Sequence, residues 1–115
     1  MEVYNYYGPG LLESIYEKAL VEELRLRDIT VESQIPVTVT YKGIPLGGDY
    51  RMDLLVDNLL ILELKSVEQL TGLHYKQLRT YLKLTNKPLG WLINFNEEDF
   101  AHGMVKVINR YYQPA

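Results

Sequence analysis

The sequence predicts a single α/β domain built on a mixed four-stranded sheet, and three observations lead to this expectation. The length of 115 residues suits one domain, which we expect to span residues 1–115. Helix-like and strand-like segments follow one another in the order α, β, β, β, α, β, α. Short turns join the first three strands, and a helix separates the third strand from the fourth. We therefore expect three antiparallel strands and a crossover helix that delivers the fourth strand beside them.

The first predicted elements are a helix and a strand. Residues 11–27 have the composition of a helix and follow the breaker Gly8-Pro9-Gly10. Residues 31–41 include the run Val37–Tyr41, whose β-branched and aromatic side chains favour a strand. Pro36 indicates a break or an edge position, because proline cannot donate a hydrogen bond to a neighbouring strand.

Two strands form the predicted centre of the sheet. Gly47-Gly48 interrupts the chain before a strand over residues 50–56. A second strand over residues 60–66 follows a turn near Asp57-Asn58. We expect these two strands to pair as a hairpin.

The remaining predicted elements are a helix, a strand and a last helix. Residues 74–85 are helical in composition and end before Pro88, which disfavours helix in the residue before it. Residues 89–95 predict a strand. The last helix is expected over residues 98–112, with Asp99 near its start. Its expected apolar face consists of Phe100, Met104, Val107 and Ile108.

The composition limits the classes of protein to be considered. There is no cysteine, so disulfides and thiolate zinc sites are excluded, and a reducing, cytoplasmic location is expected. No apolar run approaches the ~20 residues of a membrane span, so no membrane association is expected. A net charge of -3 argues against binding nucleic acid by overall charge alone.

Three charged residues lie in apolar segments that read as buried strands. They are Asp53 in the first strand of the hairpin and Glu63 and Lys65 in the second. An unpaired charge there would cost several kcal/mol, so these residues call for an explanation. Glu63 and Lys65 are two residues apart and share a face of the strand. Two carboxylates able to hold a divalent cation, with a lysine beside them, predict a site for phosphodiester hydrolysis. The alternative for Glu63 and Lys65 is an ion pair at a sheet edge.

The turn of the hairpin decides whether the two carboxylates meet. A two-residue turn at Asp57-Asn58 would place Asp53 opposite Leu62 and send the carboxylates to opposite faces. A connection of three residues, ending at Leu59, would place Asp53 opposite Glu63. We predict the second register, and Asn58 suits the left-handed conformation that such turns need.

Short motifs along the chain match one protein family in their order. The string Gly10-Leu-Leu-Glu13-Ser-Ile-Tyr16 has the signature for which the GxxExxY proteins are named, and Gly8-Pro9 precedes it. Further matches are Gln34-Ile-Pro-Val, Tyr41-Lys-Gly, the Asp53–Lys65 hairpin, His74-x-x-Gln77-Leu-x-x-Tyr81-Leu82-Lys83 and Leu92-Ile93-Asn94-Phe95-Asn96. The chain therefore resembles the GxxExxY family over essentially its whole length, and that family is placed in the PD-(D/E)XK nuclease superfamily.

The resemblance implies a fold and a metal site. The fold would be a restriction-endonuclease-like core, α-β-β-β-α-β, with an added C-terminal helix. Asp53 and Glu63 would bind Mg²⁺ or Mn²⁺, with the carbonyl oxygen of Leu64 as a further ligand, because hard cations prefer oxygen ligands. Lys65 would stabilise charge at the phosphate, and Glu13 and Gln77 would assist.

Several supporting residues keep two interpretations. Glu13 is either a further ligand of metal or water, or a helix-terminal acid stabilised by the helix dipole. Tyr16 is either a core residue or a hydrogen-bond partner of Glu13. The spacing of His74, Gln77 and Tyr81 puts all three on one helix face. Gln77 resembles the polar residue near the lysine and phosphate, Tyr81 is equally a packing residue, and His74 alone would be a solvated or capping histidine.

The helix over residues 74–85 also carries a basic stripe that continues just beyond its end. Its members, Lys76, Arg79, Lys83 and Lys87, recur at helical spacing. Such a stripe either follows a phosphate backbone or is a solvated face. The ten tyrosines of the chain likewise either stack on bases, form an interface or fill half-buried positions.

Two functional hypotheses follow. The first is a Mg²⁺- or Mn²⁺-dependent nuclease acting on DNA or RNA. The second is a catalytically inactive binding or assembly module that keeps the nuclease-like core, with homodimerisation through tyrosine-rich surfaces as one arrangement. The intact acidic and lysine positions favour the enzyme, and the acidic net charge and small size favour the module.

Overall fold

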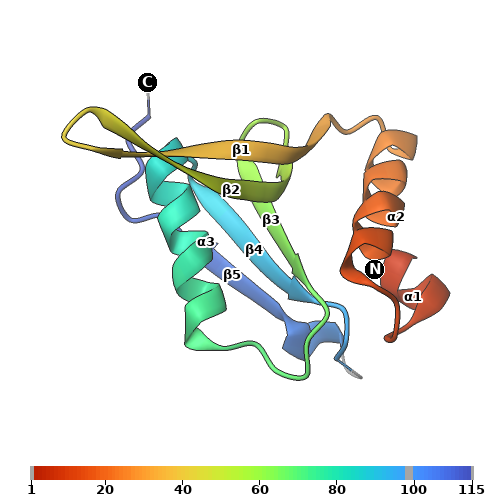
Figure 1. The fold of residues 1–115 in the computed structure, drawn as a ribbon. Coiled ribbons are helices and arrows are strands. Elements are labelled where there is room, and N and C mark those ends of the chain that lie inside the picture. The colour runs from red at the N-terminus through yellow and green to blue at the C-terminus, as the bar shows by residue number, and fades with distance from the viewer. Residues whose placement is uncertain (1, 98–99, 115) are drawn as a thin grey trace.

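The protein folds around one mixed sheet, seen in a computed structural model that describes residues 2–97 and 100–114. Within the described residues the sheet has five strands in the order β1-β2-β3-β4-β5. They are β1 (Val31–Tyr41), β2 (Ile44–Val56), β3 (Leu60–Lys65), β4 (Leu89–Asn94) and β5 (Met104–Ile108). Figure 1 shows the long β1–β2 hairpin running at an angle to the shorter strands β3, β4 and β5.

Helices cover both faces of the sheet. They are α1 (Glu2–Tyr7), α2 (Glu13–Leu26) and α3 (Gly72–Thr85), with a short 3₁₀ helix η1 (Phe100–Gly103) before β5. In Figure 1, α1 and α2 lie together at one side of the molecule, and α3 runs along the other. Helix α2 follows the predicted boundaries closely, and α1 was not predicted. None of the described helices combines the length and the apolar character that a membrane-spanning helix needs.

The connections between strands follow the predicted topology. Strands β1, β2 and β3 are antiparallel neighbours, and α3 carries the chain over to β4, which runs parallel to β3. Pro36 lies in β1, at the edge of the sheet, where its missing N–H costs no ladder bond. The expectation of a mixed α/β sheet is confirmed.

The end of the chain differs from the prediction. Residues 104–108 form strand β5, antiparallel to β4, instead of the expected helix over 98–112, so the sheet has five strands and not four. Glu98 and Asp99, the expected start of that helix, lie outside the described residues. Val107 is buried while Lys106 and Ile108 on either side of it are exposed. This alternation has the period of a strand. Pairing with β5 also gives hydrogen-bond partners to the N–H and C=O groups on the edge of β4, which would be unpaired if residues 104–108 were helical.

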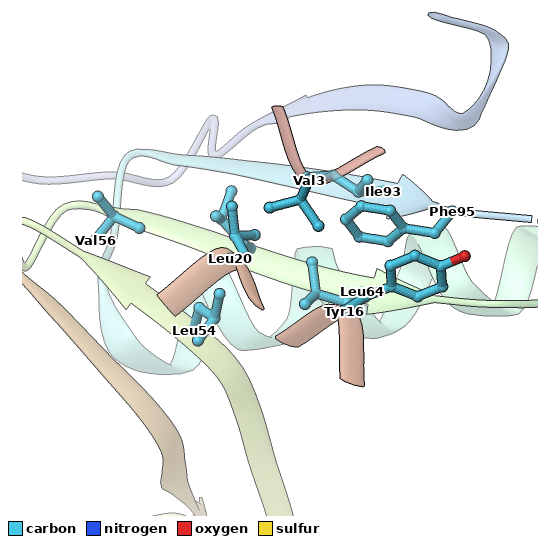
Figure 2. Packing of buried hydrophobic residues seen from close by; sticks show 9 residues of the cluster. Val3, Tyr16, Leu20, Leu54, Val56, Leu64, Ile93 and Phe95 are labelled. Atoms are coloured by element: carbon cyan, nitrogen blue, oxygen red, sulfur yellow. The ribbon is translucent and has the colours of Figure 1, made fainter. Parts of the chain in front are cut away.

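Two apolar clusters, one on each face, hold the helices to the sheet. Under α1 and α2, Tyr16 stacks on Phe95 with ring centroids 4.3 Å apart and planes 9° from parallel (Figure 2). The hydroxyl group of Tyr16 donates to the carbonyl of Gly8 and accepts from the N–H of Leu11 at 3.1 Å. The second cluster joins α3 to the opposite face through Leu78, Tyr81 and Leu82. The strands that carry Asp53 and Glu63 therefore lie between two packed layers.

Gly103 tests the pairing of β5 with β4. A Cβ added there would overlap the backbone oxygen of Asn94 and crowd the side chain of Glu97. We expect Gly103→Ala to lower the free energy of unfolding by about 1–3 kcal/mol, because overpacking forces the strands apart. Urea denaturation followed by circular dichroism measures this change.

Gly72→Ala is the matched control. A Cβ at Gly72, in the first turn of α3, meets nothing within 4 Å. Its stability should equal or slightly exceed that of the wild type, because alanine favours helix over glycine. Equal stability of Gly103→Ala and the wild type would contradict the described end of the sheet.

Candidate metal and phosphodiester site

The hairpin of β2 and β3 has the register that brings the two predicted carboxylates together. The pairs are Val56 with Leu60, Leu55 with Ile61 and Leu54 with Leu62, so the next residues in line are Asp53 and Glu63. The connection has three residues, Asp57 to Leu59. Asp57 and Asn58 have φ values of 51° and 58°, in the left-handed region. The predicted three-residue turn, with Asn58 left-handed, is confirmed.

The ladder between β2 and β3 stops at the two acids, and their side chains replace the missing backbone bonds. The N–H of Asp53 donates to Glu63 Oε1 at 3.1 Å. In return, the N–H of Leu64 donates to Asp53 Oδ2 at 2.7 Å. Each carboxylate thus satisfies a backbone donor of the opposite strand at the point where the strands separate. This reciprocal pair fixes both side chains.

The surroundings favour the protonated forms of both acids. Glu63 is 3% exposed, and burial, then the charge of Asp53, raises its pKa to about 8. Burial also raises the pKa of Asp53, although the Leu64 N–H and the charge of Lys65 act in the opposite direction. Two desolvated carboxylates that repel each other are a site where a cation would be strongly stabilised.

Lys65 lies at the end of β3, two residues after Glu63. Its positive charge lowers the pKa of both carboxyl groups. Among the described residues, however, neither carboxylate has a lysine nitrogen within the 4.0 Å of a salt bridge. The alternative interpretation of Glu63 and Lys65 as a direct ion pair therefore finds no such contact here.

A small cavity opens onto Asp53 from the side of α2. It measures about 200 Å³ and is lined by Glu13, Ser14, Glu17, Gln34, Asp53 and Leu64. Glu13 is the first residue of α2, and its charge contributes to raising the pKa of both Asp53 and Glu63. The structure thus brings Glu13 to the site while also placing it at a helix N-terminus, so both interpretations of this residue stay open.

Glu17 and Gln34 are neighbours of the site that the sequence analysis did not select. Gln34 has a φ of 52° and interrupts the pairing of β1 with β2 opposite Asp53. Its amide donates to Glu17 at 2.8 Å, and a hydrogen bond from Gln34 lowers the pKa of Asp53. Two features of the sequence could have identified these residues. Glu17 lies one helical turn after Glu13, and Gln34 begins one of the family motifs.

Helix α3 approaches the two acids from the opposite face. Gln77 donates to the hydroxyl group of Tyr81 at 3.2 Å. Burial, followed by the charges of Glu63 and Asp53, raises the pKa of Tyr81. Gln77 and Tyr81 therefore lie together on the acid-facing flank of α3.

Two of the supporting residues have structural roles. His74 accepts a hydrogen bond from the Thr71 N–H at 3.1 Å through Nδ1, so it caps the start of α3. The capping interpretation of His74 is confirmed. Tyr16 is a fully buried core residue whose hydroxyl group binds the loop before α2.

The members of the basic stripe have different surroundings. Arg79 and Lys83 face a groove between α3 and β5. Lys87 donates to Asn58 Oδ1 in the β2–β3 turn at 3.0 Å, and Lys76 is exposed. Lys76, Arg79 and Lys83 keep the helical spacing of one face of α3, whereas Lys87 lies beyond the end of the helix.

The donor set fits a hard divalent cation bound largely by water. Asp53 and Glu63 each accept one backbone hydrogen bond, which leaves carboxylate lone pairs free for a metal ion. Within residues 2–97 and 100–114, no group of three or more His, Cys, Asp or Glu side chains is close enough to hold a metal. Mg²⁺ is compatible with this arrangement, since it commonly takes one or two carboxylates and keeps several waters.

The raised pKa of Glu63 predicts how stability depends on pH without metal. Between the ordinary value of 4.5 and about 8, the folded protein keeps a proton that the unfolded chain loses. The free energy of unfolding should therefore fall as pH rises through this range, by up to about 1.4 kcal/mol per pH unit, and level off above it. Glu63→Gln should flatten this slope. Urea denaturation from pH 5 to 9 in EDTA is the measurement.

Glu32→Gln is the control, because Glu32 is an exposed carboxylate of the same sheet. This variant should keep the wild-type slope. If Glu63→Gln keeps the slope as well, Glu63 does not hold a proton in the folded state.

The family model described as the PD-(D/E)XK nuclease superfamily matches residues 1–107. No curated protein and no solved structure matches the chain significantly. The family match covers most of the sequence, and the mixed α/β sheet is consistent with the core of that family. The chain belongs to the PD-(D/E)XK nuclease superfamily.

Proposed function

We propose that the protein is a divalent-metal-dependent nuclease of the GxxExxY type that hydrolyses phosphodiester bonds in DNA or RNA. The observation that carries the proposal is the pairing of Asp53 and Glu63 where β2 and β3 separate. A stabilising ion pair would explain buried carboxylates in an ordinary core, and none is found for these two among the described residues. A bound cation would supply the missing charge.

Asp53, Glu63 and the carbonyl oxygen of Leu64 would hold Mg²⁺ or Mn²⁺. When bound, such an ion polarises a phosphoryl oxygen and makes bound water more acidic. The reciprocal hydrogen bonds keep the two carboxylates in place before the ion arrives, so little reorganisation is needed on binding.

The other residues of the site would act on the phosphate and the water. Lys65 is the last residue of β3, the strand that carries Glu63. It would stabilise negative charge that develops on the phosphate. Glu13 lines the cavity beside Asp53, where it would orient water. Gln77, held by Tyr81, would contact the substrate from the opposite face.

Metal binding predicts a gain in stability. Because the ion binds the folded protein and not the unfolded chain, unfolding should cost about 2.7 kcal/mol more when Mg²⁺ or Mn²⁺ is present at 100 times its dissociation constant. Asp53→Asn should gain much less. Asp57→Asn is the matched control, since Asp57 is exposed in the turn of the same hairpin, and it should respond as the wild type does. Denaturation with and without each ion tests this, and an equal response of Asp53→Asn would rule out the metal site.

Lys65 separates an enzyme from a binding module. Lys65→Met should leave the metal response intact or slightly stronger, because a nearby positive charge repels the ion. It should lower the rate of cleavage by ~100-fold or more, since a preorganised charge at the transition state is lost. Lys18→Met, on the exposed side of α2, is the control and should cleave normally. The assay uses single-stranded, double-stranded and branched DNA and RNA with Mn²⁺.

Two results would contradict the nuclease proposal. Wild-type protein that cleaves no substrate, although it gains stability from Mn²⁺, would indicate the non-catalytic module. Cleavage that survives Lys65→Met and Asp53→Asn alike would place the chemistry elsewhere.

A further inference from the structure

A second and larger hollow lies on the other flank of α3, away from the two acids. It measures about 610 Å³ and runs between α3 and the C-terminal segment that contains β5. Its charged lining consists of Arg79, Lys83, Lys106 and Arg110, and the described residues that line it include no acid. A wholly basic groove in a chain of net charge -3 indicates an anionic ligand.

The positive charges of this groove are not neutralised by carboxylates. In the described part of the chain, none of the four has an acid within salt-bridge distance. Two of the four basic side chains make cation–π contacts with tyrosine rings instead. The guanidinium of Arg79 lies 5.9 Å from the centre of the Tyr75 ring, and Lys83 Nζ lies 4.9 Å from the centre of the Tyr111 ring. Cation–π contacts order these side chains and leave their charge available to a ligand.

The far wall of the groove is fixed to α3. The side-chain amide of Asn109 donates to the carbonyl oxygens of Leu82 and Lys87 at 3.1 and 2.9 Å. Its carbonyl accepts from the N–H of Tyr111 at 2.9 Å. Arg110 and Tyr111 therefore follow a residue that is anchored to the end of α3, so the groove is formed before any ligand binds.

We propose that this groove binds single-stranded nucleic acid, with phosphates on the four basic side chains and a base against Tyr111. Basic grooves that also present aromatic rings are typical of single-strand binding, because bases stack on the rings while cations follow the backbone. Tyr111 is 69% exposed, which leaves ring surface for a base. The bases of a duplex are paired and could not stack on the Tyr111 ring. An acidic peptide would bind the basic side chains but would make no stacking contact with this ring.

The groove would be an anchoring site separate from the site of cleavage. Gln77 and Tyr81 face the acids, whereas Arg79 and Lys83 face the groove from the other flank of the same helix. A strand that reaches both sites must cross the exposed side of α3, where Lys76 is solvent-exposed. This role as a substrate anchor rests on the proposed nuclease function, but binding in the groove does not.

Binding without metal tests the groove by itself. The probe is a fluorescein-labelled single-stranded thymidine oligonucleotide of about 20 nucleotides, long enough for one site. Its affinity is measured by fluorescence anisotropy in EDTA, from 50 to 200 mM salt. Lys83→Gln and Lys106→Gln should each weaken binding roughly five- to tenfold at 50 mM salt and reduce the slope of log affinity against log salt by about 0.7. Tyr111→Leu should weaken binding about fivefold or more and leave the slope unchanged.

Lys42→Gln is the matched control. Lys42 also lies over a tyrosine ring, 5.3 Å from the centre of Tyr41, but in the tip of the β1–β2 hairpin. Lys42→Gln removes one positive charge outside the groove, as the other two lysine substitutions do inside it, and it should change the affinity for the oligonucleotide less than twofold. Because all the substituted side chains are exposed, circular dichroism should show an unchanged fold.

Three results would overturn the inference. Binding by Lys83→Gln and Lys106→Gln as tight as that by Lys42→Gln would show that the groove is not the binding site. Tighter binding of a duplex that is insensitive to Tyr111→Leu would exclude a single-strand site. Equal competition by polyglutamate, charge for charge, would show a general polyanion surface.

The binding and cleavage assays together test the groove and the nuclease proposal independently. Weakened binding by the groove variants in EDTA, with no cleavage by the wild type in Mn²⁺, would support the groove and contradict the nuclease. Normal binding by those variants, with wild-type cleavage intact, would contradict the groove and leave the nuclease standing.

Discussion

The reciprocal hydrogen bonds between Asp53 and the strand of Glu63 are the constraint on which the candidate site depends. A hairpin that continued its regular ladder would use the N–H of Asp53 in backbone pairing, and the two carboxylates would have no donors to hold them. Here β2 pairs with β3 only from Leu54 to Val56, and at Asp53, where the strands separate, each acid side chain binds the backbone of the opposite strand. The separation of the strands and the placement of the acids are therefore one structural feature. The packed layers on both faces keep the two strands from closing again.

This arrangement places two acids that repel each other at one buried position, which is electrostatically unfavourable when both are charged. Burial and mutual repulsion raise the pKa values of both acids, and Lys65 offsets only part of the effect. Evolution toward stability alone would favour an apolar residue at either position, because replacing buried charge by packed hydrocarbon is often stabilising. Two acids and a lysine in an otherwise apolar hairpin therefore do not serve the stability of the fold, and they support the proposed cation site.

The sequence predicted the register of the hairpin because only a three-residue turn places Asp53 opposite Glu63. The positions of Asp53 and Glu63 and the character of Asn58 were enough to derive the register, and α2, α3 and the crossover to β4 followed from periodicity and breakers. The C-terminal helix failed because Phe100, Met104, Val107 and Ile108 match helical spacing, while pairing with the edge of β4 is a tertiary effect that no local pattern reveals. Gln34 begins one of the family motifs, but that motif does not place it beside Asp53. Its left-handed backbone at a break in the β1–β2 ladder depends on the partner strand.

The error at the C-terminus also changes how the basic residues are understood. With a helix there, Lys106 and Arg110 would have fallen on a solvated surface and the basic stripe would have belonged to α3 alone. As strand β5 and an anchored tail, the same segment places two more cations and Tyr111 opposite Arg79 and Lys83. Helix α3 then separates an acidic site on one flank from a basic groove on the other. An overall charge of -3 does not oppose binding to a polyanion in such a molecule, because screening at physiological salt limits each charge to a range of about 8 Å. The local sign of each flank, and not the total, decides what it attracts.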